Sequence, residues 1–432
     1  MTIYDEAMQM KEELVACRRD LHAHPELAWT EFRTASHVAK SLKALGYEVL
    51  MGDACMKADE MMGVPDKAEL SRAMGRAIKE GADPELVKKM EGGKTGVVGI
   101  MHFAKPGKTV GLRFDMDCLL VEENPTDAHR PTRDGFASTH PGLMHACGHD
   151  GHTAIGLGVA RLIAAHKDEM AGTVKLCFQP GEEGVMGARG MVASGIVDDV
   201  DYFLSGHIGL GNGENNSLVC MTEGFLATSK IDAFFTGKPA HAGANPQNGR
   251  NALLAAAQAS LALHTISRHS DGPSRINVGI LKAGTGRNVI PDNAVIKFET
   301  RGGSTAINEF MEGEARRMIK AAADMYGVTV KMVARGSAAS GNSSPDMGEE
   351  VYEVVKGLGV YSDIEKKHTV SGSEDCSYFM SRVQDHGGKA VYMLYGTEEA
   401  SGHHTSEFDF NEDVLPLSVY TVTELVKHFT NK

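Results

Sequence analysis

The chain has 432 residues, of which 42% are apolar and 23% are charged, an ordinary composition for a globular protein. This length exceeds the size at which one hydrophobic core usually keeps growing, so two domains are expected. The formal net charge of −13 argues against a nucleic-acid-binding protein, which needs an excess of lysine and arginine. We find no run of about 18 apolar residues and no charged-then-apolar leader, which predicts a cytoplasmic protein without a membrane partner. The seven dispersed cysteines, without a CxxC pair, favour the same reducing compartment.

The first regular segment, residues 4–45, carries apolar residues at the spacing of three and four that is typical of helices. Pro25 should divide it into two helices, and Gly46 is expected to cap its C-terminal end. Residues 53–93 are predicted to form a helical hairpin inserted into the surrounding domain, because two pairs of proline and aspartate resemble helix starts. This insertion is either a solvated excursion or a surface that contacts a partner.

Short apolar runs then alternate with helical segments. The apolar runs are "TGVVGIMHF", "TVGLRFDMD", "GTVKLCFQP" and "VDYFLSGHIG". Such runs are typical of a parallel sheet that is buried on both faces. The sequence therefore predicts an α/β domain with a mostly parallel central sheet and flanking helices. Each cluster of acids or histidines follows one of these runs, at the edge where an open α/β sheet keeps its binding crevice.

The pattern changes between residues 224 and 338. Strand, helix, strand, strand, helix and strand follow one another there, which predicts a ferredoxin-like β-α-β-β-α-β domain with its helices on one antiparallel sheet. After it, "SGSEDCSYFM" restores the first pattern. One domain is therefore expected from residues 1–223 and 339–432, with the second domain, 224–338, inserted into it.

The stretch "HACGHDGH", residues 145–152, is rich in residue types that bind transition metals. Cys147 and His149 lie two positions apart on a glycine-flanked turn, and thiolate and imidazole suit zinc and similar ions. The stretches "GEEG", "SGHIG" and "SGHHTSEF" add three further candidate ligands, which are Glu183, His207 and His404. Five ligands exceed the needs of one tetrahedral ion. They suit two divalent ions about 3.5 to 4 Å apart, an arrangement that hydrolases use to activate water and polarise a carbonyl group.

Three carboxylates beside these ligands have candidate roles. If Glu183 binds metal, Glu182 can accept the proton of an attacking water and deliver it to the leaving nitrogen. A pair of glutamates alone is more often an exposed acidic turn, but this pair stands between an apolar strand and a glycine-rich loop. Asp115 and Asp117 either hydrogen-bond a ligand histidine from behind or cap a turn.

The inserted domain offers three more candidates. His241 lies in the loop "GKPAHAG", and Asn288 lies in "GRNVIPDNA". An asparagine amide can stabilise an oxyanion, and the guanidinium of Arg301 can bind a carboxylate with two hydrogen bonds. Taken singly, each of the three is more simply interpreted as an ordinary surface residue.

These motifs together, including "RRDLHAHPEL", "MHACGHDGHTA", "QPGEEG" and "GHIG", resemble the two-metal amidohydrolases and peptidases that include aminoacylases, hippurate hydrolases and carboxypeptidase G. The similarity covers nearly the whole chain. It implies two divalent ions per subunit, manganese or zinc, held by the five candidate ligands, with Glu182 as the catalytic carboxylate. In this family the last ligand stands four residues before a phenylalanine, so Phe408 selects His404 rather than His403. Arg113 stands where relatives carry a histidine ligand, and Cys147 stands where they carry an aspartate.

The resemblance also implies that the inserted domain is a lid and a dimer interface. Its histidine, His241, would reach a neighbouring active site and stabilise the tetrahedral intermediate, while Asn288 and Arg301 would hold the substrate. The expected partners are a small N-acyl amino acid and a second subunit. That subunit is either a second copy of the chain or a homologous B subunit.

The resemblance implies hydrolysis of the amide bond of p-aminobenzoyl-glutamate or a related folate fragment, which gives p-aminobenzoate and glutamate. One alternative is a broader N-acyl amino acid deacylase or dipeptidase. Another is a non-catalytic metal-binding subunit of a hetero-oligomer. Glu182 beside a complete ligand set argues against the latter, because a binding protein does not need a general base.

Overall fold

The computed structural model describes residues 1–210 and 213–432, which form two compact units. Unit 1 comprises Met1–Glu223, Asn342–Val370 and Asp375–Lys432. Unit 2 comprises Gly224–Gly341 and the short segment Ser371–Glu374. The sequence-based boundaries ended the second domain at residue 338 and left that short segment in the first.

Unit 1 is built on an eight-stranded sheet with the order β1-β2-β4-β3-β5-β14-β6-β12. The four central strands, β4, β3, β5 and β14, are parallel to one another, whereas β1, β2 and β6 pair antiparallel with their inner neighbours. The α/β prediction is confirmed, with a mixed sheet whose centre is parallel. The strands are β1 Glu48–Met51, β2 Val97–His102, β3 Lys105–Asp115, β4 Ala171–Gln179, β5 Tyr202–Ile208, β6 Ser217–Val219, β12 Asp363–Glu365 and β14 Lys389–Gly396, with β7 Thr222–Glu223 and β13 His368–Thr369 as a separate pair.

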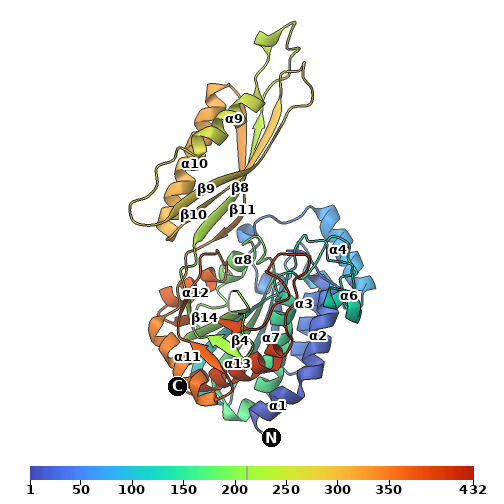
Figure 1. The fold of residues 1–432 in the computed structure, drawn as a ribbon, viewed down its shortest axis with the longest axis vertical. Helices are drawn as coiled ribbons and strands as arrows, with labels where there is room; N and C mark the ends of the chain where they lie inside the picture. The colour runs from blue at the N-terminus through green and yellow to red at the C-terminus, as the bar shows by residue number, and fades with distance from the viewer. Residues whose placement is uncertain (211–212) are drawn as a thin grey trace. The chain divides into compact units, whose positions relative to one another are not determined.

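Helices cover both faces of this sheet (Figure 1). Helices α7 and α13 pack on β3 and β4, and α12 packs on β5 and β14. Adjacent residues of β5 show the two faces, because Leu204 joins the core beneath α7 while Phe203 stacks on Phe379 of α12. The helices of unit 1 are α1 Ile3–Gln9, α2 Lys11–Ala23, α3 Phe32–Ala44, α4 Lys67–Lys79, α5 Pro84–Lys89, α6 Arg130–Asp134, α7 His149–Ala165, α8 Ala188–Val192, α11 Pro345–Leu358, α12 Ser377–Asp385 and α13 Val414–Thr430. Short 3-10 turns are η1 Gly52–Ala54, η2 Ala58–Glu60 and η3 Lys167–Glu169.

The N-terminal helical prediction is largely confirmed. The chain leaves the helical conformation before Pro25, as expected, and Gly46 caps α3 with a φ of 87° that favours glycine. A further break at Met10 was not predicted, because Met10 keeps helical backbone angles and neither proline nor glycine marks the bend. The predicted hairpin is also present, with the Asp66 and Asp83 side chains capping α4 and α5. Its apolar side chains join the core of unit 1, so the insertion is more than a solvated excursion.

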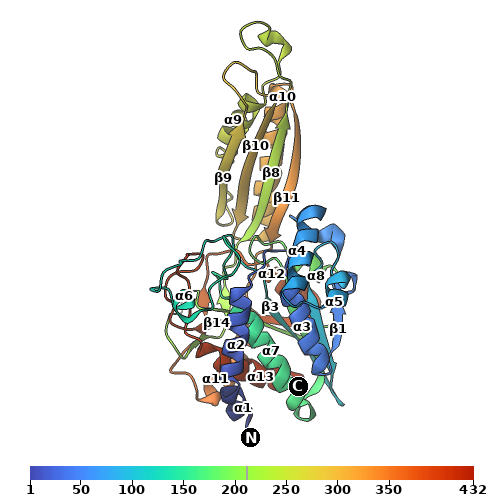
Figure 2. The same ribbon diagram turned by 90° about the vertical axis from the view of Figure 1, so that its right-hand side faces the viewer.

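Unit 2 confirms the ferredoxin-like prediction. Its four antiparallel strands have the order β11-β8-β10-β9, and both long helices cover one face (Figures 1 and 2). Along β10, Ile296 and Phe298 are buried against the helices, whereas Glu299 and Arg301 lie on the open face. The elements are β8 Ala227–Thr236, η4 Pro246–Asn248, α9 Ala252–Leu263, β9 Ser274–Ala283, β10 Asn293–Gly302, α10 Thr305–Met325 and β11 Thr329–Ala338.

A buried arginine joins distant segments of unit 1. Arg18 of α2 is fully buried and contacts Asp150 at 2.8 Å, Asp409 at 2.9 Å and Glu412 at 3.2 Å. Its guanidinium also lies 4.3 Å from the centre of the Phe410 ring. Burial alone would raise the pKa of Asp150, but the Arg18 charge holds that pKa well below its ordinary value. Helix α2, the start of α7 and the segment before α13 are therefore joined by these contacts.

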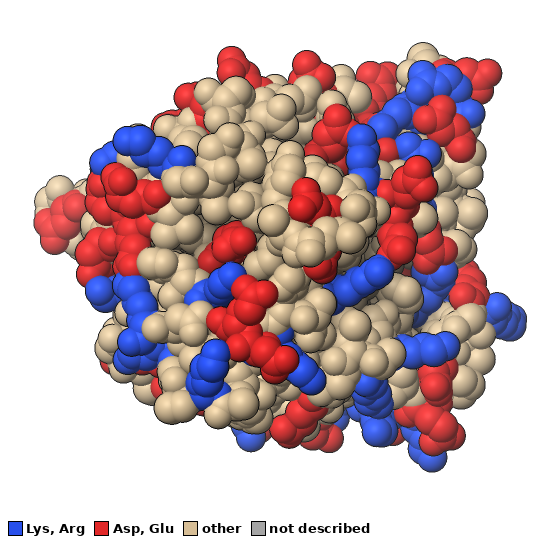
Figure 3. All heavy atoms as spheres, turned by 90° about the horizontal axis from the view of Figure 1, so that it is seen from below, with Lys and Arg blue, Asp and Glu red and all other residues tan. Residues whose placement is uncertain are grey.

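The surface carries both signs of charge. Acidic and basic side chains alternate over the face that Figure 3 shows, and the chain as a whole has 57 acidic and 44 basic residues. In the part of the chain that the structure describes, no helix combines the length and apolar character needed to cross a membrane.

Replacing Arg18 should be strongly destabilising, because Asp150 would lose its arginine partner, and Asp409 and Glu412 would keep only the partly exposed Arg19 and Arg130. We expect Arg18→Met to lower the free energy of unfolding by about 3 to 5 kcal/mol. Arg19→Met is the matched control, since Arg19 also binds Glu412 but is 32% exposed, and it should cost about 1 kcal/mol or less. Denaturant unfolding measures both, and equal losses would contradict the role given to Arg18.

Candidate functional site

The candidate ligands of unit 1 gather where the central parallel strands end. β3 ends at Asp115, β4 leads into Glu182 and Glu183, β5 carries His207 near its end, and the segment after β14 carries His404. Cys147 and His149 stand at the N-terminal end of α7. The carboxyl ends of parallel strands share one edge of a sheet, which explains how residues far apart in sequence meet.

The donor atoms form two overlapping groups. Cys147, His149 and His207 offer one atom each within 4.8 Å of one another, and so do Cys147, Glu183 and His404. Individual separations are 3.5 Å from Cys147 Sγ to His207 Nε2, 3.5 Å from His404 Nε2 to Glu183 Oε1, and 3.9 Å from His149 Nε2 to Glu183 Oε1. Cys147 is common to both groups, so its sulfur could serve two ions.

The chemistry of these donors fits divalent metal ions. His149 Nδ1 bonds to the carbonyl oxygen of Asp117 at 2.9 Å, and His207 Nδ1 bonds to that of Ile208 at 2.7 Å. Both rings therefore turn Nε2 towards the other donors. Among the described residues, buried His149 Nε2 and Glu183 Oε1 have no hydrogen-bond partner. Sulfur, nitrogen and oxygen donors in this proportion suit zinc or manganese.

The electrostatics of the site also favour bound cations. Burial opposes a charge on His149, but Asp115, Asp117 and Glu183 outweigh it and raise the pKa of His149 to about 10. Carboxylates that hold a proton on a buried imidazole can stabilise a metal ion in its place. Burial lowers the pKa of His207 well below its ordinary value, which keeps this ring neutral and able to bind metal.

The two adjacent histidines near the C-terminus have different surroundings. His404 has a φ of 64°, and its backbone N–H donates to Ala146 at 2.7 Å, which brings its side chain beside Glu183. The His403 ring instead packs against two other rings, with its centroid 5.3 Å from that of His207 and 4.7 Å from that of Phe408. The structure thus brings His404, not His403, into the donor groups.

Asp115 binds a histidine that the sequence did not single out. Its Oδ1 lies 2.6 Å from Nδ1 of His152, while its Oδ2 accepts from Arg113 at 2.7 Å. The His152 ring packs between His149 and His207, at centroid distances of 5.4 Å and 4.5 Å. Asp115 therefore contacts His152 directly, and its Oδ2 lies 3.8 Å from His149 Nε2. The spacing of His149 and His152 on one helix face could have revealed this pair.

Asp117 holds a turn, and its Oδ1 also lies 3.4 Å from His149 Nδ1. Its two carboxylate oxygens accept the backbone N–H groups of Glu182 and Glu183, both at 2.9 Å. Glu31 and Asp375, which the sequence did not predict, reach the same loop. Glu31 accepts from the backbone of Gly181, and Asp375 accepts from the backbone at the far end of the loop. Burial and the nearby charge of Asp117 raise the pKa of Glu31 well above its ordinary value.

Unit 2 separates its three candidates. His241 is exposed, and its Nδ1 accepts backbone N–H groups at 3.0 and 3.2 Å, which leaves the proton on Nε2. Asn288 lies beside it, because the carbonyl oxygen of Asn288 accepts from Ala242 at 3.0 Å. Asn293, at the start of β10, pairs with Thr236, which lies five residues before His241. Arg301 is eight residues further along β10 than Asn293, a distance of about 26 Å at the usual rise of a strand. One copy of unit 2 therefore cannot bring His241 and Arg301 to the same small ligand.

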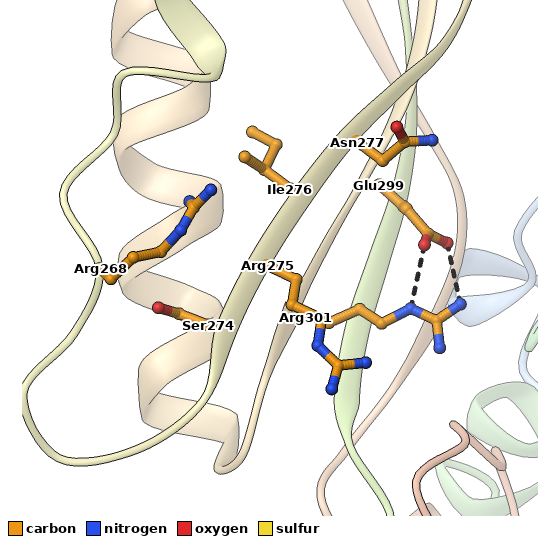
Figure 4. Close-up of a pocket in the computed structure, with 7 residues that line it drawn as sticks. All are labelled: Arg268, Ser274, Arg275, Ile276, Asn277, Glu299 and Arg301. Carbon is orange, nitrogen blue, oxygen red and sulfur yellow. Dashed lines mark hydrogen bonds and ion pairs between the residues drawn. The ribbon is translucent and has the colours of Figure 1, made fainter.

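Arg301 lines a cavity of about 410 Å³ on unit 2 (Figure 4). It pairs with Glu299 at 3.0 and 3.3 Å, and Arg275 faces it from the neighbouring strand β9. Arg268 approaches from the loop before β9. Three guanidinium groups and one carboxylate line this cavity, so its net charge is positive.

Comparisons with known proteins show the family to which the chain belongs. Residues 111–428 match the family model of peptidase family M20/M25/M40. The chain is 48% identical to indole-3-acetyl-aspartic acid hydrolase of Enterobacter agglomerans, over 98% of this chain and 97% of the relative. It is 47% identical to the A subunit of p-aminobenzoyl-glutamate hydrolase of Escherichia coli, over 95% and 94%. The crystal structure of an aminobenzoyl-glutamate utilization protein from Klebsiella pneumoniae is 39% identical, with a TM-score of 0.85 over 99% of this chain and 98% of that one.

The chain therefore belongs to peptidase family M20/M25/M40. It is an amide-bond hydrolase of the metallopeptidase type, with donor groups for divalent metal ions.

Removing divalent ions should abolish hydrolysis and destabilise unit 1. Restoring an ion to about 100 times its dissociation constant should raise the free energy of unfolding by about 2.7 kcal/mol. Cys147→Ala should lose most of this gain, whereas Cys220→Ala, an equally buried cysteine outside the donor groups, should retain it. Thermal unfolding with and without zinc measures the difference, and an equal gain in both variants would exclude Cys147 as a ligand.

Proposed function

We propose that the protein hydrolyses the amide bond between an aromatic acyl group and an acidic amino acid. p-Aminobenzoyl-glutamate is the first candidate substrate, and p-aminobenzoate and glutamate are its products. The observation that carries this proposal is the position of Glu182, whose carboxylate lies within 4.8 Å of donor atoms of His149 and Glu183 while five other side chains are available as ligands. The names of the two relatives point to the same class, since one names an aspartic acid conjugate and the other a glutamate conjugate.

Glu182 is the proposed general base and acid. Its side chain is 13% exposed, and Oε2 lies 3.9 Å from His149 Nε2, so it can reach both the donor groups and solvent. It would accept a proton from water as that water attacks the amide carbonyl. It would then deliver the proton to the leaving nitrogen as the carbon–nitrogen bond breaks.

Two ions per chain, manganese or zinc, are proposed for the five donors. Cys147 and His149 would act with Glu183, His207 and His404, and the shared sulfur of Cys147 favours a closely spaced pair. When bound, such ions would lower the pKa of water and stabilise negative charge on the carbonyl oxygen. Asp115 and Asp117 would support this site from behind, the first through His152 and the second through the turn at Glu182.

The arginines of unit 2 are proposed to recognise the acidic amino acid. Arg301 would bind one carboxylate of the substrate, since a guanidinium matches a carboxylate with two hydrogen bonds. Arg275 faces Arg301 across the two strands and could bind a second carboxylate, which an aspartate or glutamate conjugate has and a neutral amino acid lacks.

His241 and Asn288 are proposed to act in the active site of a second subunit. The separation of about 26 Å along β10 supports this, because Arg301 and His241 of one chain cannot share a substrate. The second subunit would be another copy or a homologous B subunit. We place the protein in the cytoplasm, where its seven unpaired cysteines would remain reduced.

A substrate series tests the proposed specificity. We expect turnover of p-aminobenzoyl-glutamate and indole-3-acetyl-aspartate, and much slower turnover of p-aminobenzoyl-leucine. Arg275→Met should lower kcat/KM for the two acidic substrates by about 10-fold or more and leave the leucine compound unaffected. Arg335→Met is the control, since Arg335 is in the same unit but pairs with Asp232 at 2.9 Å. Equal rates on all three compounds would favour a broader N-acyl amino acid deacylase.

Mixing two inactive variants tests the shared site. Glu182→Gln should reduce kcat by about 10² to 10⁴-fold with unchanged metal content, and His241→Ala should also impair turnover. If each site takes Glu182 and His241 from different copies, equal mixing should restore about a quarter of wild-type activity. Asn288→Ala should complement Glu182→Gln in the same way. Activity that stays at the level of the separate variants would contradict a site shared between two copies.

A further inference from the structure

The loop after β4, residues 181–188, carries both glutamates of the site on an irregular path. We call it the GEEG loop. Val185 has a φ of 56°, which a β-branched residue rarely adopts. Two bonds close the loop, from the N–H groups of Met186 and Gly187 to the carbonyl oxygen of Gly181, both at 2.9 Å. Such a conformation persists only when the surrounding structure holds it.

Three buried carboxylates from distant parts of unit 1 supply that support. They belong to Glu31, Asp117 and Asp375, and each residue is at most 1% exposed. The backbone N–H groups that they accept, at 2.9 to 3.1 Å, are those of Gly181, Glu182, Glu183, Gly187 and Ala188. Both ends of the GEEG loop are therefore fixed by hydrogen bonds to its backbone.

We propose that Glu31 is a positioning residue for hydrolysis, which acts with Asp117 and Asp375 as a carboxylate cradle that directs Glu182 and Glu183. The inference rests on the proposed roles of those two glutamates. Glu31 contacts the loop through Gly181 alone, and its other oxygen accepts the hydroxyl of Thr95 at 2.6 Å. It affects the chemistry through the position of the loop, not through the reacting atoms.

Hydrogen-bond geometry, not the charge, is the property of Glu31 that this role requires. A glutamine at position 31 can keep both bonds, because its oxygen can accept from Gly181 while its amide donates to Thr95. The Thr95 hydroxyl can then turn to the carbonyl oxygen of Gly93, 3.4 Å away. Asp117 differs from Glu31 because both of its carboxylate oxygens accept backbone N–H groups. An asparagine at position 117 would place its N–H₂ group against one of these donors.

The cradle can be tested without any substrate. Zinc affinity is measured by competition with a chromogenic chelator, because Glu183 is a proposed ligand and should lose its position when the GEEG loop shifts. We expect Glu31→Ala and Asp117→Asn to weaken zinc binding by about 10 to 100-fold. Glu31→Gln should stay within about threefold of the wild type. With p-aminobenzoyl-glutamate, the first two variants should lower kcat by a similar factor and leave KM almost unchanged.

Glu26→Ala is the matched control. Glu26 is equally buried and also accepts two backbone N–H groups, from Arg33 at 3.0 Å and Thr34 at 2.8 Å, but these belong to α3. The Glu26→Ala variant should be less stable than the wild type but should have the same zinc affinity and the same kcat. If Glu31→Ala behaves like Glu26→Ala, or if Glu31→Gln fails as badly as Glu31→Ala, the positioning role is wrong.

The Glu31→Ala variant could fail to fold, and the wild type could fail to hydrolyse the proposed substrate. Should Glu31→Ala not fold, Asp117→Asn decides, because it preserves the shape of the side chain; unchanged zinc affinity in that variant would overturn the cradle. If the wild type binds zinc but does not hydrolyse p-aminobenzoyl-glutamate, the proposed substrate fails. The zinc measurements would still support or overturn the cradle in that case.

Discussion

Buried negative charge at the carboxyl edge of the central sheet is the constraint on which the rest of the site depends. A buried carboxylate is unfavourable unless hydrogen bonds or a cation compensate it. This protein uses both means. Asp117 accepts backbone N–H groups, Asp115 pairs with Arg113, and Asp375 combines backbone N–H groups with Arg113 at 3.3 Å, whereas Glu183 lies beside the nitrogen donors of the site. The fixed carboxylates thus keep the loop in place, and the donors without such partners are left for metal.

Much of the fold and the donor set could be predicted because their signals are local. A buried strand followed by glycine and a polar cluster marks a strand end, and parallel strands bring such ends together without further information. The contacts behind the ligands could not be predicted in this way. Glu31 and Gly181 are 150 positions apart, and Asp375 and Gly187 are 188 apart, so no spacing along the chain relates them. The same is true of Asp115 and His152, whose pairing depends on how α7 packs on β3.

In unit 2 the sequence patterns predicted the elements correctly but could not assign functions to single residues. Alternation along β10 predicts that Glu299 and Arg301 share one face, whereas the neighbouring strand must be known before Arg275 can be placed opposite them. The length of β10 then separates Arg301 from the segment with His241 and Asn288. The length of β10 therefore favours an arrangement in which two subunits contribute to each site.

The contacts of Arg18 have a consequence for the biosynthesis of the enzyme. Arg18 is synthesised well before its buried partners Asp409 and Glu412, which follow it by 391 and 394 positions. Unit 2 is translated between them and can complete its own core first, because domains generally fold as units during synthesis. Unit 1 cannot complete its fold until β14, His404 and α13 have been synthesised. A nascent chain that has not yet reached His404 therefore lacks part of the donor set, and hydrolytic activity should begin only after the segment up to α13 has been made.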